Sequence, residues 1–229
     1  MIVKKIQNQH GLRAEEVPQL MLTHGVEYQK VACVNWPKEF PYAPKMEVAL
    51  AHTGDSLLLH YRVEENCIRA AAEADGGRVW EDSCCEIFLQ PSSPNTHHPT
   101  PYFNIECNCA GTLLIGKGED RHDRQPAAAT TLQSANRWSS LMKTAVSGEN
   151  GRYTIPLKDG KFTWHMALVV PATALFDSGI TDFSGQTLRG NIYKCGDCLT
   201  TPHFLSLFPI DTPQPDFHRP EFFGELTFE

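Results

Sequence analysis

Two short segments of the sequence concentrate side chains that can bind a polyhydroxylated ligand. The first begins at Trp80 and carries Glu86, and the second, residues 102–108, carries Asn104 and Glu106. An indole ring packs against the C–H face of a sugar, while carboxylates accept hydrogen bonds and amides both donate and accept them. If the two segments are paired strands, these four side chains share one surface, and that surface favours carbohydrate binding.

The spacing of polar and apolar side chains predicts that both segments are strands. In residues 102–108 the two kinds alternate, with Phe103, Ile105 and Cys107 on one parity and Asn104, Glu106 and Asn108 on the other. This period of two is typical of a half-buried β-strand. In residues 80–89, Trp80 and Glu86 share a parity, so both are expected on the face that also carries Asn104.

The amino-acid sequence of these and later segments resembles that of a known family. Residues 80–88 read Trp-Glu-Asp-Ser-Cys-Cys-Glu-Ile-Phe, and further matching segments are residues 102–108, 189–197, 202–206, 209–211 and 216–225. From about Asn35 to the C-terminus the chain resembles family 9 carbohydrate-binding modules, and more closely the stand-alone family 9-like carbohydrate-binding proteins. The resemblance implies non-catalytic binding of a mono- or oligosaccharide.

The resemblance also implies roles for single residues. Trp80 corresponds to a tryptophan that stacks on a sugar ring, and Glu86 to a carboxylate that binds hydroxyls. The late strand that contains Asn191 and Lys194 contributes polar contacts in the modules, although Lys194 could equally form a salt bridge with a nearby glutamate. The modules use a second tryptophan near Leu207, and here Phe208 is the aromatic side chain that could replace it.

The distribution of strand and turn signals predicts an all-β fold. We expect one domain over residues 1–229, a single antiparallel β-sandwich of the jelly-roll or immunoglobulin-like two-sheet type, with one or two short helices. Expected strands are residues 46–51, 57–63, 112–116, 162–170, 187–195, 205–207 and 225–228, in addition to the two signature strands. Helical turns are expected within residues 14–22, 127–142 and 172–176, and an exposed loop at 91–101.

Composition and charge exclude several partners. The chain has 229 residues and a formal net charge of −7, whereas nucleic acid binding requires a basic surface. No apolar run approaches the roughly 18 residues of a membrane span. The first ten residues lack the apolar core of a secretory signal. We therefore expect a cytoplasmic protein or, if a signal peptide has been removed, a periplasmic or extracellular one.

The eight cysteines lie mostly within apolar strands, so we expect reduced thiols that pack as small hydrophobic side chains. The pair Cys195-x-x-Cys198 is a weak zinc signal, since structural zinc takes four ligands and no second pair follows at a suitable spacing. Cys84 and Cys85 are neighbours on a strand and point to opposite faces. No dense Asp/Asn loop suggests calcium, so we assign no cofactor and no metal.

Two other functions stay open at this point. Glu86 and Glu106 are a possible carboxylate pair of a glycoside hydrolase. Alternatively, the sandwich could be a DOMON-like module that binds haem or a protein partner, with strand histidines at His52, His60, His165 and His203. The segment 216–221 is expected to be a structural clamp, with His218 and Arg219 as secondary binding candidates.

Overall fold

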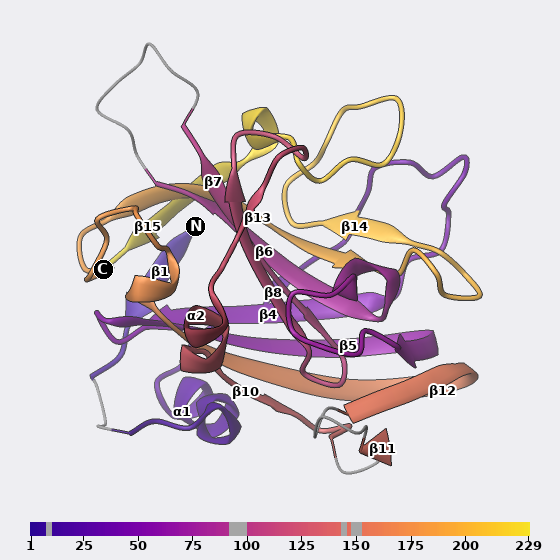
Figure 1. Ribbon diagram of the computed structural model, residues 1–229, viewed down its shortest axis with the longest axis horizontal. Helices are drawn as coiled ribbons and strands as arrows, with labels where there is room; N and C mark the ends of the chain where they lie inside the picture. Colours follow the sequence, from indigo (N-terminus) through magenta and orange to yellow (C-terminus); the bar gives the residue numbers. More distant parts are fainter. Residues whose placement is uncertain (8–10, 92–99, 143–145, 148–152) are drawn as a thin grey trace.

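The strands of the protein form two β-sheets that pack face to face. The computed structural model describes residues 1–7, 11–91, 100–142, 146–147 and 153–229 (Figure 1). Within these residues the first sheet has the order β9–β8–β7–β6–β13–β15–β1, with β14 beside β13 and β3 beside β14, and the second has the order β1–β4–β5–β12–β10, with β2 beside β4. We call them the β6–β7 sheet and the β5–β12 sheet.

The bounds of these strands follow the chain in order. They are β1 (Ile2–Lys5), β2 (Gln29–Lys30), β3 (Cys33–Val34), β4 (Lys45–His52), β5 (Ser56–Ala70), β6 (Cys84–Gln90), β7 (Tyr102–Asn108), β8 (Leu113–Gly118), β9 (Gln125–Pro126), β10 (Asn136–Ser139), β11 (Val146–Ser147), β12 (Tyr153–Pro171), β13 (Thr187–Cys195), β14 (Phe204–Ser206) and β15 (Gly224–Phe228). The helices are α1 (Val17–Thr23) and α2 (Ala129–Ser134), and the 3₁₀ turns are η1 (Ala14–Glu16), η2 (Val79–Glu81), η3 (Ala172–Ala174) and η4 (Pro220–Phe222). None of the helices is long and apolar enough to span a membrane, as far as the described residues go.

Strand β1 joins the two sheets along one edge of the sandwich. Its first half pairs in parallel with β15, through Ile2 opposite Thr227, and its second half pairs in parallel with β4, through Lys5 opposite His52. Figure 1 shows β1 between these two strands, near both termini of the chain. The other pairings in the two sheets are antiparallel, so the prediction of an antiparallel β-sandwich is confirmed, with β1 as a parallel strand that the sequence pattern did not indicate.

Both faces of the β6–β7 sheet are covered. The side chains of Cys85, Ile87 and Ile105 point into the main core between the sheets. The opposite parity, which includes Phe88 and Tyr193, packs under a second apolar cluster formed by the loops that cross the outer face. Every residue of β7 is therefore buried. Its apolar side chains face the core between the sheets, and its polar side chains face the covered outer side of the sheet and not bulk water.

Every predicted strand has a counterpart in the structure, but β1, β2, β3, β9, β10 and β11 were not predicted, and β10 follows α2 within residues 127–142, where only a helical turn was expected. Strand β13 has the expected bounds, and β4 and β5 form the expected hairpin, although β5 and β12 are longer than predicted. Trp80 lies in the 3₁₀ turn η2 and not on a strand, because β6 begins only at Cys84. Most of the loop predicted at 91–101 lies outside the described residues.

Candidate functional site

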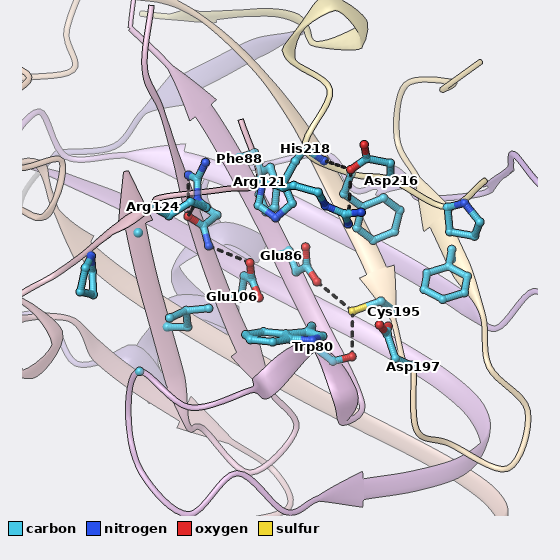
Figure 2. A pocket seen from close by; sticks show the side chains of 18 of the residues that line it. Trp80, Glu86, Phe88, Glu106, Arg121, Arg124, Cys195, Asp197, Asp216 and His218 are labelled. Atoms are coloured by element: carbon cyan, nitrogen blue, oxygen red, sulfur yellow. Dashed lines mark hydrogen bonds and ion pairs between the residues drawn. The ribbon is translucent and has the colours of Figure 1, made fainter. Parts of the chain in front are cut away.

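A pocket of about 440 Å³ opens on the outer face of the β6–β7 sheet. Strands β6, β7, β8 and β13 form its floor, η2 forms one wall, and the segments 121–126 and 204–218 form the rest (Figure 2). The side chains that line it are acidic, basic and aromatic: Trp80, Glu86, Phe88, Asn104, Glu106, Arg121, Arg124, Cys195, Asp197, Phe204, Asp216, Phe217 and His218 are among them. The structure thus brings together Trp80, Glu86, Asn104 and Glu106, which the sequence placed on one surface.

Two buried carboxylates lie side by side on the floor. Glu86 on β6 is directly opposite Glu106 on β7, and both side chains are almost fully buried. The Asn104 amide donates to Glu106 Oε1 at 2.8 Å, and the Cys195 thiol donates to Glu86 Oε1 at 2.8 Å. Glu106 Oε2 is buried and has no hydrogen-bond partner among the described residues. A ligand hydroxyl is the kind of group that would satisfy it.

Burial changes the ionisation of this pair. Removal from water raises the pKa of Glu86 well above its usual value, and the neighbouring Glu106 carboxylate raises it further. Burial also raises the pKa of Glu106, to about 7, although the hydrogen bond from Asn104 and the charge of Arg124 oppose the rise. Because two adjacent carboxylates ionise with difficulty, the pair holds a proton near neutral pH and can both donate and accept.

A cationic residue fixes the orientation of Asn104. Arg124 donates from Nε and Nη2 to Asn104 Oδ1, at 3.0 and 2.7 Å, and from Nη2 to the Tyr102 carbonyl at 3.0 Å. Its guanidinium carbon lies 4.4 Å from the centre of the Tyr102 ring. Because the amide oxygen is occupied, the amide nitrogen points to Glu106, as this hydrogen-bond network assigns it. Arg124 therefore holds the polar floor in one arrangement.

A second group of polar residues closes the upper rim in Figure 2. Arg121 pairs with Asp216 at 3.5 Å, and the Asp216 carboxylate accepts from the His218 backbone N–H at 3.0 Å. His218 Nδ1 is 2.8 Å from the Tyr102 hydroxyl, and burial together with Arg124 lowers the pKa of His218 to about 3. His218 is therefore neutral, and the segment expected to be a clamp contributes side chains to the pocket.

The turn that carries Trp80 is held by Asp82, the residue that follows it. Asp82 is fully buried and accepts hydrogen bonds from the backbone N–H groups of Ala71 and Ala72, at 2.9 and 3.1 Å, and from the Asn108 side chain at 2.9 Å. Arg69 adds an ion pair at 3.1 Å. With its turn fixed in this way, Trp80 lies half-buried in the wall, beside Glu86 and Glu106 (Figure 2).

Phe208, the expected second aromatic side chain of the site, does not line the pocket. Asn191 is fully buried and is used by the backbone of Phe208: its Nδ2 donates to the Phe208 carbonyl and its Oδ1 accepts from the Phe208 N–H, both at 3.0 Å. Neither residue lines the pocket. Phe204 and Phe217 line it instead, and Phe217 stacks on Tyr193 with ring centres 4.2 Å apart.

Lys194 lies on the opposite side of the sheet from the pocket. Its ammonium group, fully buried, is 2.9 Å from Glu65 Oε2 and also contacts His203 Nε2 and the Cys195 carbonyl, each at 2.9 Å. Glu65 belongs to β5, so this ion pair connects the two sheets through the core. Of the two roles considered for Lys194, the structure shows a salt bridge, with Glu65 in place of Glu86 or Glu106.

The four strand histidines do not converge on one site. His60 and His165 stack on the outer face of the β5–β12 sheet, His52 packs against Phe183 and Phe228, and His203 lies beside Lys194. The arginines of the pocket wall were not among the predicted site residues, because they lie in a strongly charged segment, residues 119–125, with no apolar alternation that would indicate a strand. Only the pairing of β8 with β9 brings Arg124 over the sheet.

Comparisons with known proteins agree with the fold and identify the family. The model of carbohydrate-binding family 9 matches residues 15–228. A crystal structure from Bacteroides uniformis, of a protein assigned as carbohydrate-binding, is 41% identical, covers 100% of this chain and 98% of its own, and has a TM-score of 0.90.

Two further solved structures show the same fold at low identity. Both are of a family 9 carbohydrate-binding module from Caldicellulosiruptor kristjanssonii, one in complex with glucose and one with cellotriose, at 10% identity with TM-scores of 0.57 and 0.56. They cover 100% of this chain and 95% and 94% of their own. No curated protein matches the chain. Since the family model spans nearly the whole sequence, the chain belongs to carbohydrate-binding family 9.

Proposed function

We propose that the pocket binds a mono- or oligosaccharide, with one sugar ring against the Trp80 indole and its hydroxyls on Glu86, Asn104 and Glu106. The observation that carries this proposal is the combination of a half-buried tryptophan with an adjacent buried carboxylate oxygen, Glu106 Oε2, that lacks a partner. A sugar supplies both an apolar C–H face and hydroxyl donors.

The size and chemistry of the pocket support this proposal. Its volume of about 440 Å³ falls in the range of roughly 300–1,000 Å³ that is usual for small-molecule sites. The family is one of carbohydrate-binding modules, and the structurally similar module from Caldicellulosiruptor kristjanssonii was solved with glucose and with cellotriose. Glucose and short β-linked glucans are therefore the first ligands to test.

We further propose that binding takes place without a reaction. Both carboxylates lie next to each other on one floor, whereas a glycosidase places its two carboxyl groups on either side of the scissile bond. Hydrolysis remains the second candidate because of one observation: the raised pKa of Glu106, to about 7, would suit a general acid. An assay of reducing-sugar release on the same ligands decides between the two.

The direct test is calorimetry with glucose, cellotriose and a panel of other saccharides on wild type and on Trp80→Ala. We expect the variant to bind at least tenfold more weakly. Trp138→Ala is the matched control, because Trp138 is also half-buried but packs on the outer face of the other sheet. If no saccharide binds wild type, or if Trp80→Ala binds as wild type does, the proposal is wrong.

A further inference from the structure

Two cysteines far apart in sequence meet beside the carboxylate floor. Cys84 on β6 is directly opposite Cys195 on β13, and Glu86, two residues after Cys84, points to the same face of the sheet. The two Sγ atoms and one carboxylate oxygen of Glu86 all lie within 4.8 Å of one another, and all three residues are buried. Cys195 and Glu86 also line the pocket, so the group is reached from there.

We propose that Cys84, Glu86 and Cys195 form a binding site for a thiophilic divalent cation, Zn²⁺ being the best match, with a fourth coordination position that faces the pocket. Two thiolates and one carboxylate are ligands that zinc accepts, and three protein ligands with one open position are typical of zinc sites that also contact water or a ligand. The proposal concerns the metal alone and does not depend on sugar binding.

The present contacts show what the cation would replace. The Cys195 thiol donates its proton to Glu86 Oε1 across 2.8 Å. A metal ion between the same two atoms would take the place of that proton. Tetrahedral zinc, with bonds of about 2.3 Å to sulfur and about 2.0 Å to oxygen, holds the two atoms roughly 3.5 Å apart. The pair must therefore open by several tenths of an ångström, a movement that Glu86 can make by rotating its side chain toward the pocket.

The other cysteines do not belong to this group. Cys85 and Cys107 are directly opposite each other, but they face the core between the sheets. Cys198, the second member of the Cys-x-x-Cys sequence, is exposed. The Cys-x-x-Cys motif suggests Cys198 as the partner of Cys195, whereas the register of β6 and β13 places Cys84 beside it.

Metal binding at this site is expected to release protons from the two thiols. Burial raises the pKa of Cys84 to about 12 and that of Cys195 well above its usual value, so both thiols are protonated at neutral pH without metal. Binding must displace these protons, and the apparent affinity is therefore expected to rise steeply with pH.

Cobalt titration tests the proposal, because thiolate ligands give Co²⁺ an intense near-ultraviolet charge-transfer absorption. The protein is kept reduced with a phosphine, stripped of metal, and titrated with Co²⁺ and then Zn²⁺, both in the native state and after refolding with the metal. We expect one Co²⁺ per chain, the charge-transfer band, and displacement by Zn²⁺. Cys195→Ser should abolish the band, and Glu86→Gln should weaken binding at least tenfold with the band retained.

Two controls separate this site from other thiols. Cys107→Ser makes the same substitution at an equally buried position on the same sheet but on the opposite face, and Cys198→Ser removes the exposed thiol. Both should bind Co²⁺ as wild type does, with folding checked by circular dichroism. The proposal is overturned if wild type shows no charge-transfer band in either preparation, or if the band is lost in Cys198→Ser and persists in Cys195→Ser.

Discussion

Replacing Lys194 with methionine is expected to destabilise the protein strongly and to leave its pocket intact. In the wild type the ammonium group has three partners at 2.9 Å, namely Glu65, His203 and the Cys195 carbonyl, and no exposure to solvent. Burial alone would lower the pKa of Lys194, but the Glu65 carboxylate outweighs it and the pKa is raised. Lysine is therefore charged in the core, where its charge neutralises that of Glu65.

The size of the effect follows from what the substitution leaves behind. Glu65 would keep the hydrogen bond from Trp164 Nε1, at 2.7 Å, and the more distant His203 Nε2, at 3.8 Å, and its charge would remain buried. Removal of one member of a buried ion pair typically costs about 3–5 kcal/mol. We expect a loss of about 4 kcal/mol in the free energy of unfolding, a large part of the 5–15 kcal/mol that a folded protein usually has.

Urea unfolding followed by tryptophan fluorescence measures this loss, and a second substitution identifies its cause. Lys194→Met combined with Glu65→Gln removes both charges, and glutamine can still accept from Trp164. The double variant should return to within about 2 kcal/mol of wild type, since neutral replacements of buried pairs are well tolerated.

Two results would refute this reasoning. One is a stability loss below about 1 kcal/mol in the single variant, which would mean that the charge is not buried as the contacts indicate. The other is a tenfold loss of saccharide affinity at unchanged stability, which would return Lys194 to the ligand site that the family resemblance suggested. The methionine side chain is similar in length to lysine, so a packing defect is a small part of the expected change.

Three further predictions concern the pocket. Because the pKa of Glu106 is raised in the folded state, from 4.5 to about 7, the folded protein binds more protons than the unfolded chain between these pH values. The free energy of unfolding should therefore fall by up to roughly 3 kcal/mol as pH rises from 4.5 to 7. Glu106→Gln should flatten this slope in denaturant titrations at several pH values. Gly116→Ala places a methyl group 2.7 Å from Asn104 Oδ1. Because Arg124 and Glu106 hold Asn104 in place, its displacement should both weaken saccharide binding in calorimetry and lower the melting temperature. Asp82→Ala removes the carboxylate that accepts hydrogen bonds from the backbone of Ala71 and Ala72 and so fixes the turn with Trp80. We expect a loss of about 3 kcal/mol in the free energy of unfolding together with reduced saccharide affinity. A variant with the stability and the affinity of wild type would contradict this role.

The sequence was sufficient to predict the parts of the site that depend on local alternation. The polar and apolar parities of residues 102–108 predicted that Asn104 and Glu106 share a face, and the register of β6 with β7 then places Glu86 opposite Glu106. These relations follow from the period of two in a strand. They need no knowledge of how distant segments cross the sheet.

Residues whose role depends on distant contacts could not be assigned in the same way. Asn191 shares the parity of the pocket face, but the backbone of Phe208 takes up its amide. Lys194 has the opposite parity, and its partner Glu65 is on the other sheet. Arg124 reaches Asn104 only because its loop folds back over β8. In each case the partner lies far away in sequence, so composition and spacing carry no signal for it.

The way in which β1 closes the sandwich has a consequence for how the chain folds during synthesis. Residues 2–3 pair with residues 227–228, so the two sheets cannot be joined along this edge until almost the whole sequence has left the ribosome. Until then β13 and residues 2–3 of β1 lack β15 between them, and their unpaired backbone groups are prone to pair with other chains. Contacts between residues so distant in sequence also form slowly. We therefore expect folding yield to depend on temperature and on the rate of translation more than the stability of the finished protein would suggest.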